Sequence, residues 1–419
     1  MPEMKDSGIE WIGMIPKNWN VDKIKYHLKR NEPKNPGNVE VLSVYREYGV
    51  IPKNSRDDNH NITSEDTSKY KYVKKGDLVI NKMKAWQGSM GVSEYEGIVS
   101  PAYFIYNFTD NYFDKKYFHF LIRNCYKDEF RRISGGIREG QWDLSADLFA
   151  DELVLIPPIK EQIKIVEFLN TKCAEIDTLY SDIEKQLEIL EEYKKSIITE
   201  AVTKGLDPDV EMKDSGIEWM GMVPSTWESN KVLNCIDFIG GSQPPLSYFE
   251  GEEKEGYVRL IQNRDYKTDD YMTFVPKRMV TKFCEVDDVM IGRYGPPLFV
   301  LHRGLKGAYN VAIMKAVPKL LDREFMAFYL QNYTLLQYIE SFSKRTAGQA
   351  GVNTDILKKY PIYVPPMEEQ KEIAIYLEKK CIEIDNVIGK KKEQLETLEQ
   401  YKKSLIYEYV TGKKEVSNE

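Results

Sequence analysis

The stretch PIKEQIKIVEFLNTKCAEIDTLYSDIEKQLEILEEYKKSIITEAVTKG (Pro158–Gly205) decides the fold, because it has the pattern of one long helix and occurs twice. A shift of 208 positions aligns it without a gap with PMEEQKEIAIYLEKKCIEIDNVIGKKKEQLETLEQYKKSLIYEYVTGK (Pro366–Lys413). The same shift aligns MKDSGIEWIGMIPKNW (Met4–Trp19) with MKDSGIEWMGMVPSTW (Met212–Trp227), identical at 12 of 16 positions. The chain is therefore a tandem duplication, and each copy has a short leader, a globular block and a long helix.

Apolar or small residues recur along both helical stretches at steps of three and four, which indicates a helix with one narrow apolar seam. In the first copy the seam is Ile159, Ile163, Val166, Leu169, Cys173, Ile176, Tyr180, Ile183, Leu187, Leu190, Tyr193 and Ile197. Prolines before each stretch, and Gly205 and Gly412 after it, are typical helix boundaries. About 44 residues at 1.5 Å each would span about 66 Å and hold the two blocks apart.

Such a seam needs a partner helix. We expect the other copy to be that partner, in an antiparallel intramolecular coiled coil, because a whole block separates the two helices and copies related by a two-fold axis run in opposite directions. The leader and the end of the second helix should then meet, with Glu419 near the N-terminal leader. An intermolecular coiled coil is the alternative.

The globular blocks are rich in short β-branched and aromatic runs bounded by Gly, Pro, Asn and Asp, which predicts strands. In the first block these are Val39–Ile51, Gly76–Met83, Gly97–Phe108 and Leu153–Pro158. Residues 115–132 have helical spacing, and the second block repeats this order. The leaders have few helix or strand features, but their apolar residues should pack on the following block. The predicted fold class is α+β: two mixed α/β domains joined by two long helices in a pseudo-two-fold tandem repeat.

The predicted domain boundaries follow from this repeat. They are 1–157 for the leader and first block, 158–205 for the first helix, 206–365 for the linker, second leader and second block, 366–413 for the second helix, and 414–419 for the tail.

Composition and motifs give little sign of catalysis. No P-loop or GxGxxG motif is present, the five cysteines lack metal-ligand spacing, and the four histidines are isolated, so we expect no nucleotide, metal or catalytic site in the chain. No segment has the length and apolarity of a membrane span or signal peptide, which predicts a cytoplasmic protein. The formal charge is −7, but the acid lies mainly in the helices, leaders and linker, and near-neutral blocks can still present a basic face.

Polar, basic and aromatic residues instead gather in Gly-flanked loops at corresponding places in the two blocks. Arg and Lys suit guanine edges, Asn and Gln suit adenine edges, and Lys also suits phosphate. The candidate DNA-binding residues are Lys82, Lys84, Trp86, Gln87, Arg138 and Gln141 in the first block, and Gln262, Asn263, Arg264, Tyr266, Arg293, Tyr294, Lys344, Arg345, Gln349 and Asn353 in the second. Ordinary polar loops remain the alternative for any single one of them. If these loops read bases, mutation of Arg138 or Arg293 should relax base choice only in the stretch of DNA that its own block contacts.

The two leaders (DSGIEW-G-M-P), the two IPP/VPP junctions followed by EQ, and the helices ending in EYKKS or QYKKS together resemble the DNA-specificity subunit of type I restriction-modification systems. The resemblance covers essentially the whole chain. It implies that each block is a target-recognition domain for one half of a bipartite DNA site and that the helices set the gap. The low identity between the blocks implies an asymmetric site, although neutral drift would also lower it.

The resemblance also implies partners: double-stranded DNA, two adenine methyltransferase (modification) subunits, and motor-endonuclease (restriction) subunits. S-adenosylmethionine and ATP would be bound by those partners, and this chain would be a non-catalytic subunit without a cofactor of its own. The alternatives are a coiled-coil scaffold whose blocks bind proteins and an enzyme whose site was not recognised.

Overall fold

The structure is a computed structural model that describes residues 3–37, 39–46, 48–56, 66–136, 142–217, 220–295, 297–342, 344–346 and 349–416, without the side chains of residues 344–346, 349 and 350. The chain divides into two compact units. The first consists of Met1–Ile183 with Glu393–Glu419, and the second of Glu184–Lys392.

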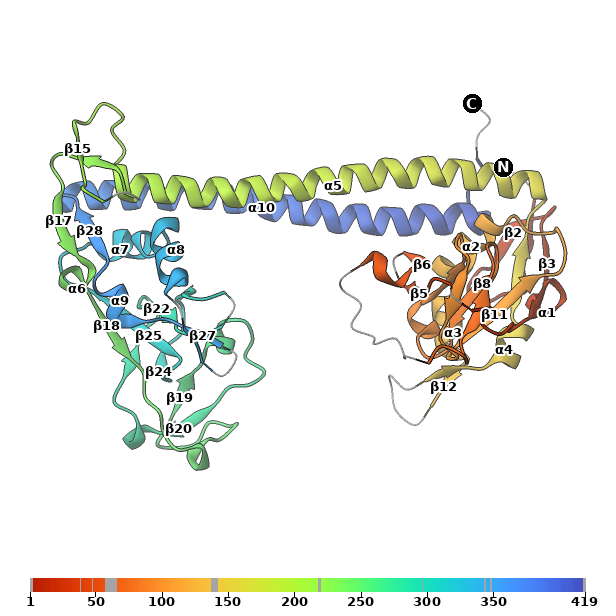
Figure 1. The fold of residues 1–419 in the computed structure, drawn as a ribbon, viewed down its shortest axis with the longest axis horizontal. Coiled ribbons are helices and arrows are strands. Elements are labelled where there is room, and N and C mark those ends of the chain that lie inside the picture. The colour runs from red at the N-terminus through yellow and green to blue at the C-terminus, as the bar shows by residue number, and fades with distance from the viewer. Residues whose placement is uncertain are drawn as a thin grey trace. The chain divides into compact units, whose positions relative to one another are not determined.

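The first unit is built on a four-stranded antiparallel sheet in the order β4-β11-β8-β9, with helices α2 and α3 in the same core (Figure 1). Its strands are β1 (Met4–Asp6), β2 (Met14–Pro16), β3 (Asn20–Lys23), β4 (Leu28–Arg30), β5 (Leu42–Tyr45), β6 (Gly49–Pro52), β7 (Lys71–Val73), β8 (Leu78–Asn81), β9 (Met90–Val92), β10 (Gly97–Val99), β11 (Tyr103–Phe108), β12 (Ser134–Gly135), β13 (Asp143–Leu144) and β14 (Leu153–Ile156). Its short helices are α1 (Ile24–His27), α2 (Lys115–Cys125), α3 (Lys127–Arg132) and α4 (Ala146–Asp151).

The second unit has the equivalent sheet in the order β18-β25-β22-β23, and a further four-stranded sheet, β20-β19-β24-β21. Its strands are β15 (Met212–Asp214), β16 (Met222–Pro224), β17 (Glu228–Lys231), β18 (Ile236–Gly240), β19 (Tyr257–Ile261), β20 (Phe274–Pro276), β21 (Phe283–Cys284), β22 (Val289–Gly292), β23 (Leu301–His302), β24 (Gly307–Tyr309), β25 (Ile313–Pro318), β26 (Lys344–Thr346), β27 (Gln349–Gly351) and β28 (Pro361–Val364). Its short helices are α6 (Val232–Cys235), α7 (Arg323–Tyr329), α8 (Tyr333–Ser341) and α9 (Thr354–Leu357).

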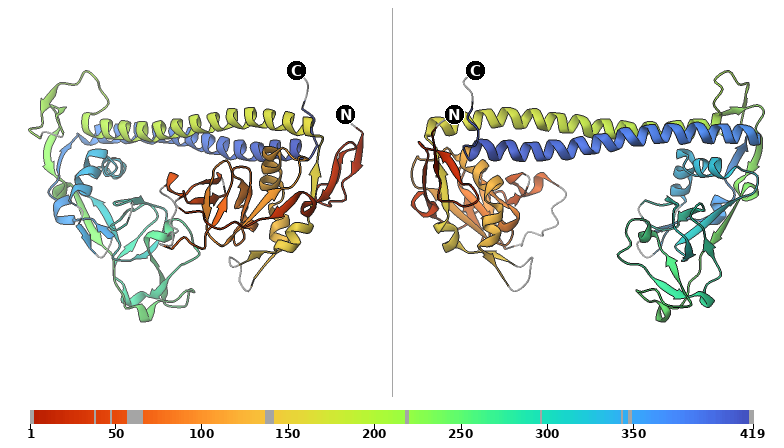
Figure 2. Two further views of the ribbon diagram at one scale, coloured as in Figure 1. Left: turned by 45° about the vertical axis from the view of Figure 1, so that its right-hand side comes forward. Right: turned by 180° about the vertical axis from the view of Figure 1, so that it is seen from behind.

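The two long helices are α5 (Ile159–Lys204) and α10 (Met367–Val410), and they lie side by side within each unit (Figures 1 and 2). In the first unit Lys402 Nζ lies 2.5 Å from Asp177 Oδ1. In the second, Lys194 Nζ lies 2.7 Å from Asp385 Oδ1. From the first ion pair to the second, the residue number rises on α5, from 177 to 194, and falls on α10, from 402 to 385. The two helices are therefore antiparallel. The predicted fold class is confirmed.

The leader differs from the expectation in its local structure. It contains a hairpin, with Lys5 opposite Ile15 in the β1–β2 pair, and an equivalent hairpin begins the second copy. Our prediction of little strand structure was wrong because three-residue strands are too short to show a period. The apolar leader residues do pack into the core of the first unit, where Ile15 and Trp19 are buried.

The leader also contacts the end of α10. Lys413 Nζ donates to the backbone oxygens of Ile12 at 2.6 Å and of Met14 at 2.5 Å. Removal from water lowers the pKa of Lys413. The start of the chain and the end of the second helix therefore meet in the first unit as predicted, although Glu419 itself lies outside the described residues.

The glutamine of each junction motif has a structural role that is the same in both units. Gln162 is fully buried; its Nε2 donates to the backbone oxygens of Pro157 at 2.7 Å and Tyr112 at 2.8 Å, and its Oε1 accepts from the Asp114 N–H at 2.8 Å. Gln370 makes the same contacts with Pro365, Leu320 and Asp322. Since Asp114 and Asp322 cap α2 and α7, each glutamine fixes the start of a long helix to the helix that covers the sheet.

Candidate nucleic-acid interface

The first candidate loop follows an inner strand of each main sheet, β8 in the first unit and β22 in the second, and has the same length in both units. In the first unit it joins β8 to β9, where Ile80 pairs with Met90; in the second it joins β22 to β23, where Ile291 pairs with Leu301. The Asn81 N–H donates to Ser89 O at 3.0 Å, and the Gly292 N–H donates to Val300 O at 2.8 Å. The two loops therefore correspond residue by residue under a shift of 211.

This shift places Gly88 opposite Phe299, and both have a left-handed backbone, with φ of 87° and 61°. Among the described residues, Phe299 alone of the non-glycine residues has a positive φ, and its side chain is 2% exposed. A buried aromatic residue in this region is strained, and such strain concentrates at functional sites. The second unit therefore has the same left-handed turn, although it lacks the glycine that would adopt this backbone conformation without strain.

Gly88→Ala is expected to destabilise the first unit by about 1–2 kcal/mol, the cost of placing an L-residue in the left-handed region. An added Cβ would meet only Arg123 O at 4.0 Å, so the cost is conformational rather than steric. Urea unfolding measures it. Gly135→Ala is the matched control, because Gly135 has no atom within 4 Å of its Cβ position and no positive φ; an equal loss there would contradict the explanation.

The end of the second candidate loop, residues 142–144 in the first unit and 351–353 in the second, lies against the first loop. The Leu144 N–H donates to Lys82 O at 2.9 Å, and the Val352 N–H donates to Arg293 O at 3.0 Å. Lys82 and Arg293 are therefore equivalent basic residues, at the first position after β8 and after β22. The structure brings together two loops that are far apart in the sequence, and it does so in the same way in each unit.

In the first unit, side chains also join the two loops. Lys82 Nζ lies 2.8 Å from Asp143 Oδ2, and the Trp86 and Trp142 rings lie with centroids 5.7 Å apart. The Trp86 indole N–H donates to Met83 O at 3.1 Å, which fixes that ring. Gln87 accepts from Arg46 at the turn between β5 and β6, and Lys84 is exposed.

In the second unit a third segment joins these loops, the 3-10 turn Asn263–Tyr266. Gln262 caps this turn and donates to Thr273 Oγ1 at 3.1 Å, and Arg264 donates to Tyr271 O at 3.2 Å. The Asn263 amide lies against Gly292, where an added Cβ would be 3.0 Å from its Oδ1. Asn263 of this turn therefore lies against the strand end that precedes Arg293.

The remaining described candidates have identifiable contacts. Tyr266 stacks on His302 at 4.3 Å and 9°, Arg293 Nη1 donates to Val311 O at 3.2 Å, and Tyr294 forms a bridge to Gly351. Asn353 caps α9 through its side chain, which is a structural role. Asn263 Oδ1, the Tyr266 hydroxyl and Arg293 Nε are buried without a partner among the described residues. Unpaired buried polar atoms are rare in folded proteins, and they indicate a bound ligand, a bound water or a strained site.

Arg138 and Gln141 lie outside the described residues, as do the side chains of Lys344, Arg345 and Gln349. The DNA-binding role of every candidate stays a prediction. Sequence reasoning missed Asp143, Arg46 and His302, which contact candidates through the fold. Asp143 lies two residues after the candidate Gln141, and this adjacency was the signal that could have found it.

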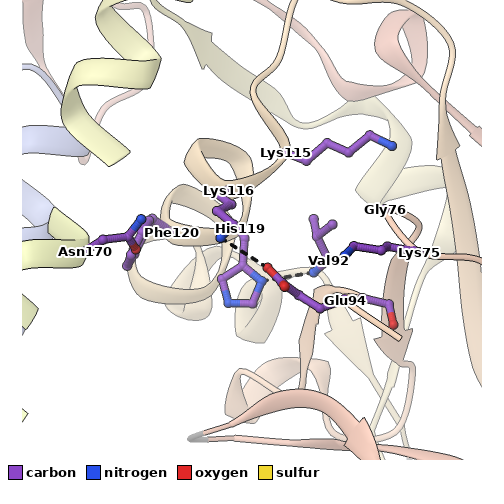
Figure 3. Close-up of a pocket in the computed structure, with 10 residues that line it drawn as sticks. Lys75, Gly76, Val92, Glu94, Lys115, Lys116, His119, Phe120 and Asn170 are labelled. Atoms are coloured by element: carbon purple, nitrogen blue, oxygen red, sulfur yellow. Dashed lines mark hydrogen bonds and ion pairs between the residues drawn. The ribbon is translucent and has the colours of Figure 1, made fainter. Parts of the chain in front are cut away.

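A basic pocket of about 450 Å³ lies beside α2 in the first unit (Figure 3). Its other walls are formed by residues 75–76, by residues 92–94 at the end of β9, and by α5. Lys75, Lys115 and Lys116 line it, together with His119 and with Asn170 of α5. Lys116 Nζ is 3.4 Å from Glu94, whereas Lys75 and Lys115 have no carboxylate within 4.0 Å among the described residues. Two amino groups are therefore available for an anion.

His119 adds no charge to this pocket. Its Nδ1 accepts from the Val92 N–H at 3.1 Å (Figure 3). Burial, and then the positive charge of Arg123, lower the pKa of His119 to about 4, so the ring is neutral at pH 7. The positive potential of the pocket comes from its lysines.

Within the described parts of the chain, no group of three or more His, Cys, Asp or Glu side chains is placed to hold a metal ion. No helix among the described residues is long and apolar enough to cross a membrane.

Comparison with known proteins supports one of the classes considered above. The family model for the type I restriction modification DNA specificity domain matches residues 287–397. Two Methanocaldococcus jannaschii proteins align over 96% of this chain and 95% of their own length: the putative type I restriction enzyme MjaX specificity subunit at 24% identity and the MjaVIII specificity subunit at 25%. Over nearly its whole length the chain is therefore similar to type I specificity subunits, and part of its second unit matches the specificity domain of that family.

The fold of the chain agrees with a solved structure. A chain from work on complex assembly and conformational transition of the type I R-M system superimposes with a TM-score of 0.69, at 14% identity, over 94% of this chain and 98% of that chain. The similarities to type I specificity subunits support a role in DNA sequence specificity.

Proposed function

We propose that this subunit reads a bipartite, asymmetric site in double-stranded DNA, one half-site per unit, and positions adenine methyltransferase and restriction subunits on it. The observation that carries the proposal is the paired-loop arrangement: both units present the same two loops on the same strand, with different side chains. Equivalent backbones would dock equivalently on DNA, while different side chains would select different bases.

The equivalent positions show how the half-sites would differ. The first unit has Lys82, Trp86 and Asp143, where the second has Arg293, Pro297 and Gly351. Lysine is a mobile point charge and arginine a planar fork of donors, so they are not interchangeable at a base edge. The proposed site is asymmetric for this reason.

Partner subunits would bind on the two long helices, which expose large apolar residues to solvent. Isolated residues of this kind are common on protein surfaces, but three on each of two paired helices, among them the repeat partners Tyr193 and Tyr401, favour an interface. They are Leu179, Ile189 and Tyr193 on α5, and Ile375, Ile382 and Tyr401 on α10. In this proposal the partners bind S-adenosylmethionine and ATP, and this chain has neither a cofactor nor catalysis of its own.

The test is to co-express the chain with an adenine methyltransferase subunit from the same genome and to map methylated adenines by single-molecule sequencing. A bipartite motif with unequal halves and one modified adenine in each half is the expected result. A stable complex that methylates without such a motif would overturn the proposal, and failure to form any complex would favour a protein-binding scaffold.

The basic pocket would contact the DNA backbone. Replacing Lys75 and Lys115 together by Gln should reduce the slope of log affinity against log salt by about 1.8, since each phosphate contact contributes about 0.9. Binding to different duplexes should weaken uniformly, because phosphate contacts carry no base information. Lys160→Gln with Lys164→Gln, on the first turns of α5, is the charge-matched control. An unchanged slope in the Lys75 and Lys115 variant would exclude the pocket from the interface.

A further inference from the structure

Lys82 and Arg293 occupy the same backbone position, but their surroundings differ in one group. In the first unit the residue before Leu144 is Asp143, whose Oδ2 is 2.8 Å from Lys82 Nζ. In the second unit the residue before Val352 is Gly351, and the Tyr294 ring takes the space, since a Cβ at Gly351 would be 3.0 Å from its Cε1. Among the described residues, therefore, the first unit has an acidic group next to this basic residue and the second unit does not.

Folding stability does not account for this acidic group. The side chains of Lys82 and Asp143 are 33% and 45% exposed, and exposed ion pairs contribute little to stability. The two loops are already joined by the Leu144 to Lys82 backbone hydrogen bond and by the Trp86–Trp142 contact. A carboxylate on a surface that approaches phosphates would be repelled unless it had a donor of its own to bind.

The major-groove edge of a G·C pair supplies that donor. Guanine presents the acceptors O6 and N7, and cytosine presents its N4 amino group as a donor. Lys82 has three N–H donors, of which Asp143 uses one, and the carboxylate keeps free lone pairs after it accepts from Lys82. The pair is thus a donor and an acceptor held side by side, which is the complement of a G·C pair.

We propose that Lys82 and Asp143 together read one G·C pair in the half-site of the first unit, with Lys82 donating to guanine and Asp143 accepting from cytosine. This inference rests on the proposed function. Asp143 also orients Lys82, because an ammonium group on a flexible four-carbon stem has no fixed direction by itself. In the part of the second unit that the structure describes, Arg293 has no acidic partner, so no group equivalent to Asp143 would read a cytosine there.

The test is a selection from duplexes randomised in both half-sites, carried out with the complete complex of this chain and its methyltransferase subunits. Asp143→Asn should lower the preference for G·C over the other base pairs about tenfold at one position of the first half-site. Base preferences in the second half-site should not change. Lys82→Gln should relax the preference at the same position. Asp151→Asn breaks another exposed ion pair of the first unit, Lys25–Asp151 at 2.7 Å, and serves as the matched control.

The outcomes separate the inference from the function on which it rests. Wild-type preferences at every position in both Asp143→Asn and Lys82→Gln would overturn the inference alone. A loss of preference spread over both half-sites would also overturn it, since it would reflect damage to the fold. A wild-type complex that selects no sequence would overturn the proposed function together with the inference.

Discussion

Gln162→Leu is expected to destabilise the first unit by about 3–4 kcal/mol. Leucine has nearly the same volume, so the loss is polar: the Asp114 N–H and the backbone oxygens of Tyr112 and Pro157 lose their partner in a buried site. Each unsatisfied buried group costs about 1–3 kcal/mol. Because Gln162 connects α5 to the cap of α2, the loss should free both elements together.

Urea unfolding gives the total change, and hydrogen exchange locates it in one unit. Gln370→Leu should act on the second unit and cost somewhat less, since the Gln370 Nε2 to Leu320 O distance is 3.4 Å where its counterpart is 2.8 Å. Lys160→Ala, two residues away and exposed, should change stability by less than about 0.5 kcal/mol. A Gln162→Leu protein as stable as the wild type would refute this account of the motif.

Removing one heptad from each long helix is expected to abolish recognition of the original site and to select a gap shorter by about three base pairs. The Lys402–Asp177 and Lys194–Asp385 pairs are 17 residues apart along both helices. Deleting Ser181–Leu187 from α5 and Lys392–Leu398 from α10 therefore keeps both pairs in register. The seven lost residues shorten each helix by about 10.5 Å, against 3.4 Å for each base pair.

Methylome mapping of the matched deletion, co-expressed with the methyltransferase subunit, measures the gap. Deleting seven residues from α5 alone is the control; it puts one ion pair out of register by two turns and should destabilise the protein without defining a new gap. An unchanged gap in the matched deletion would show that the helices do not set the spacing.

The polypeptide sequence predicted the features that depend on local or repeated patterns. The duplication, the two long helices and most strand runs follow from periodicity and from an identical order of segments in the two copies. The predicted single helix over residues 115–132 is two helices, α2 and α3, which meet at the fully buried Tyr126. The helical period continues through this break, so the sequence pattern did not indicate it.

Tertiary structure decided which side chains meet. Lys82 and Asp143 are 61 residues apart, and Tyr117 donates to Val410 across 293 residues. Periodicity reports which face of an element is buried, not which distant loop lies against it. For this reason the sequence alone determined the repeat, the seam and the family resemblance. Only the tertiary structure showed the paired loops, the buried role of Gln162 and Gln370, and the placement of Asp143 beside Lys82. These features depend on long-range hydrogen bonds and close packing that form only when the chain folds.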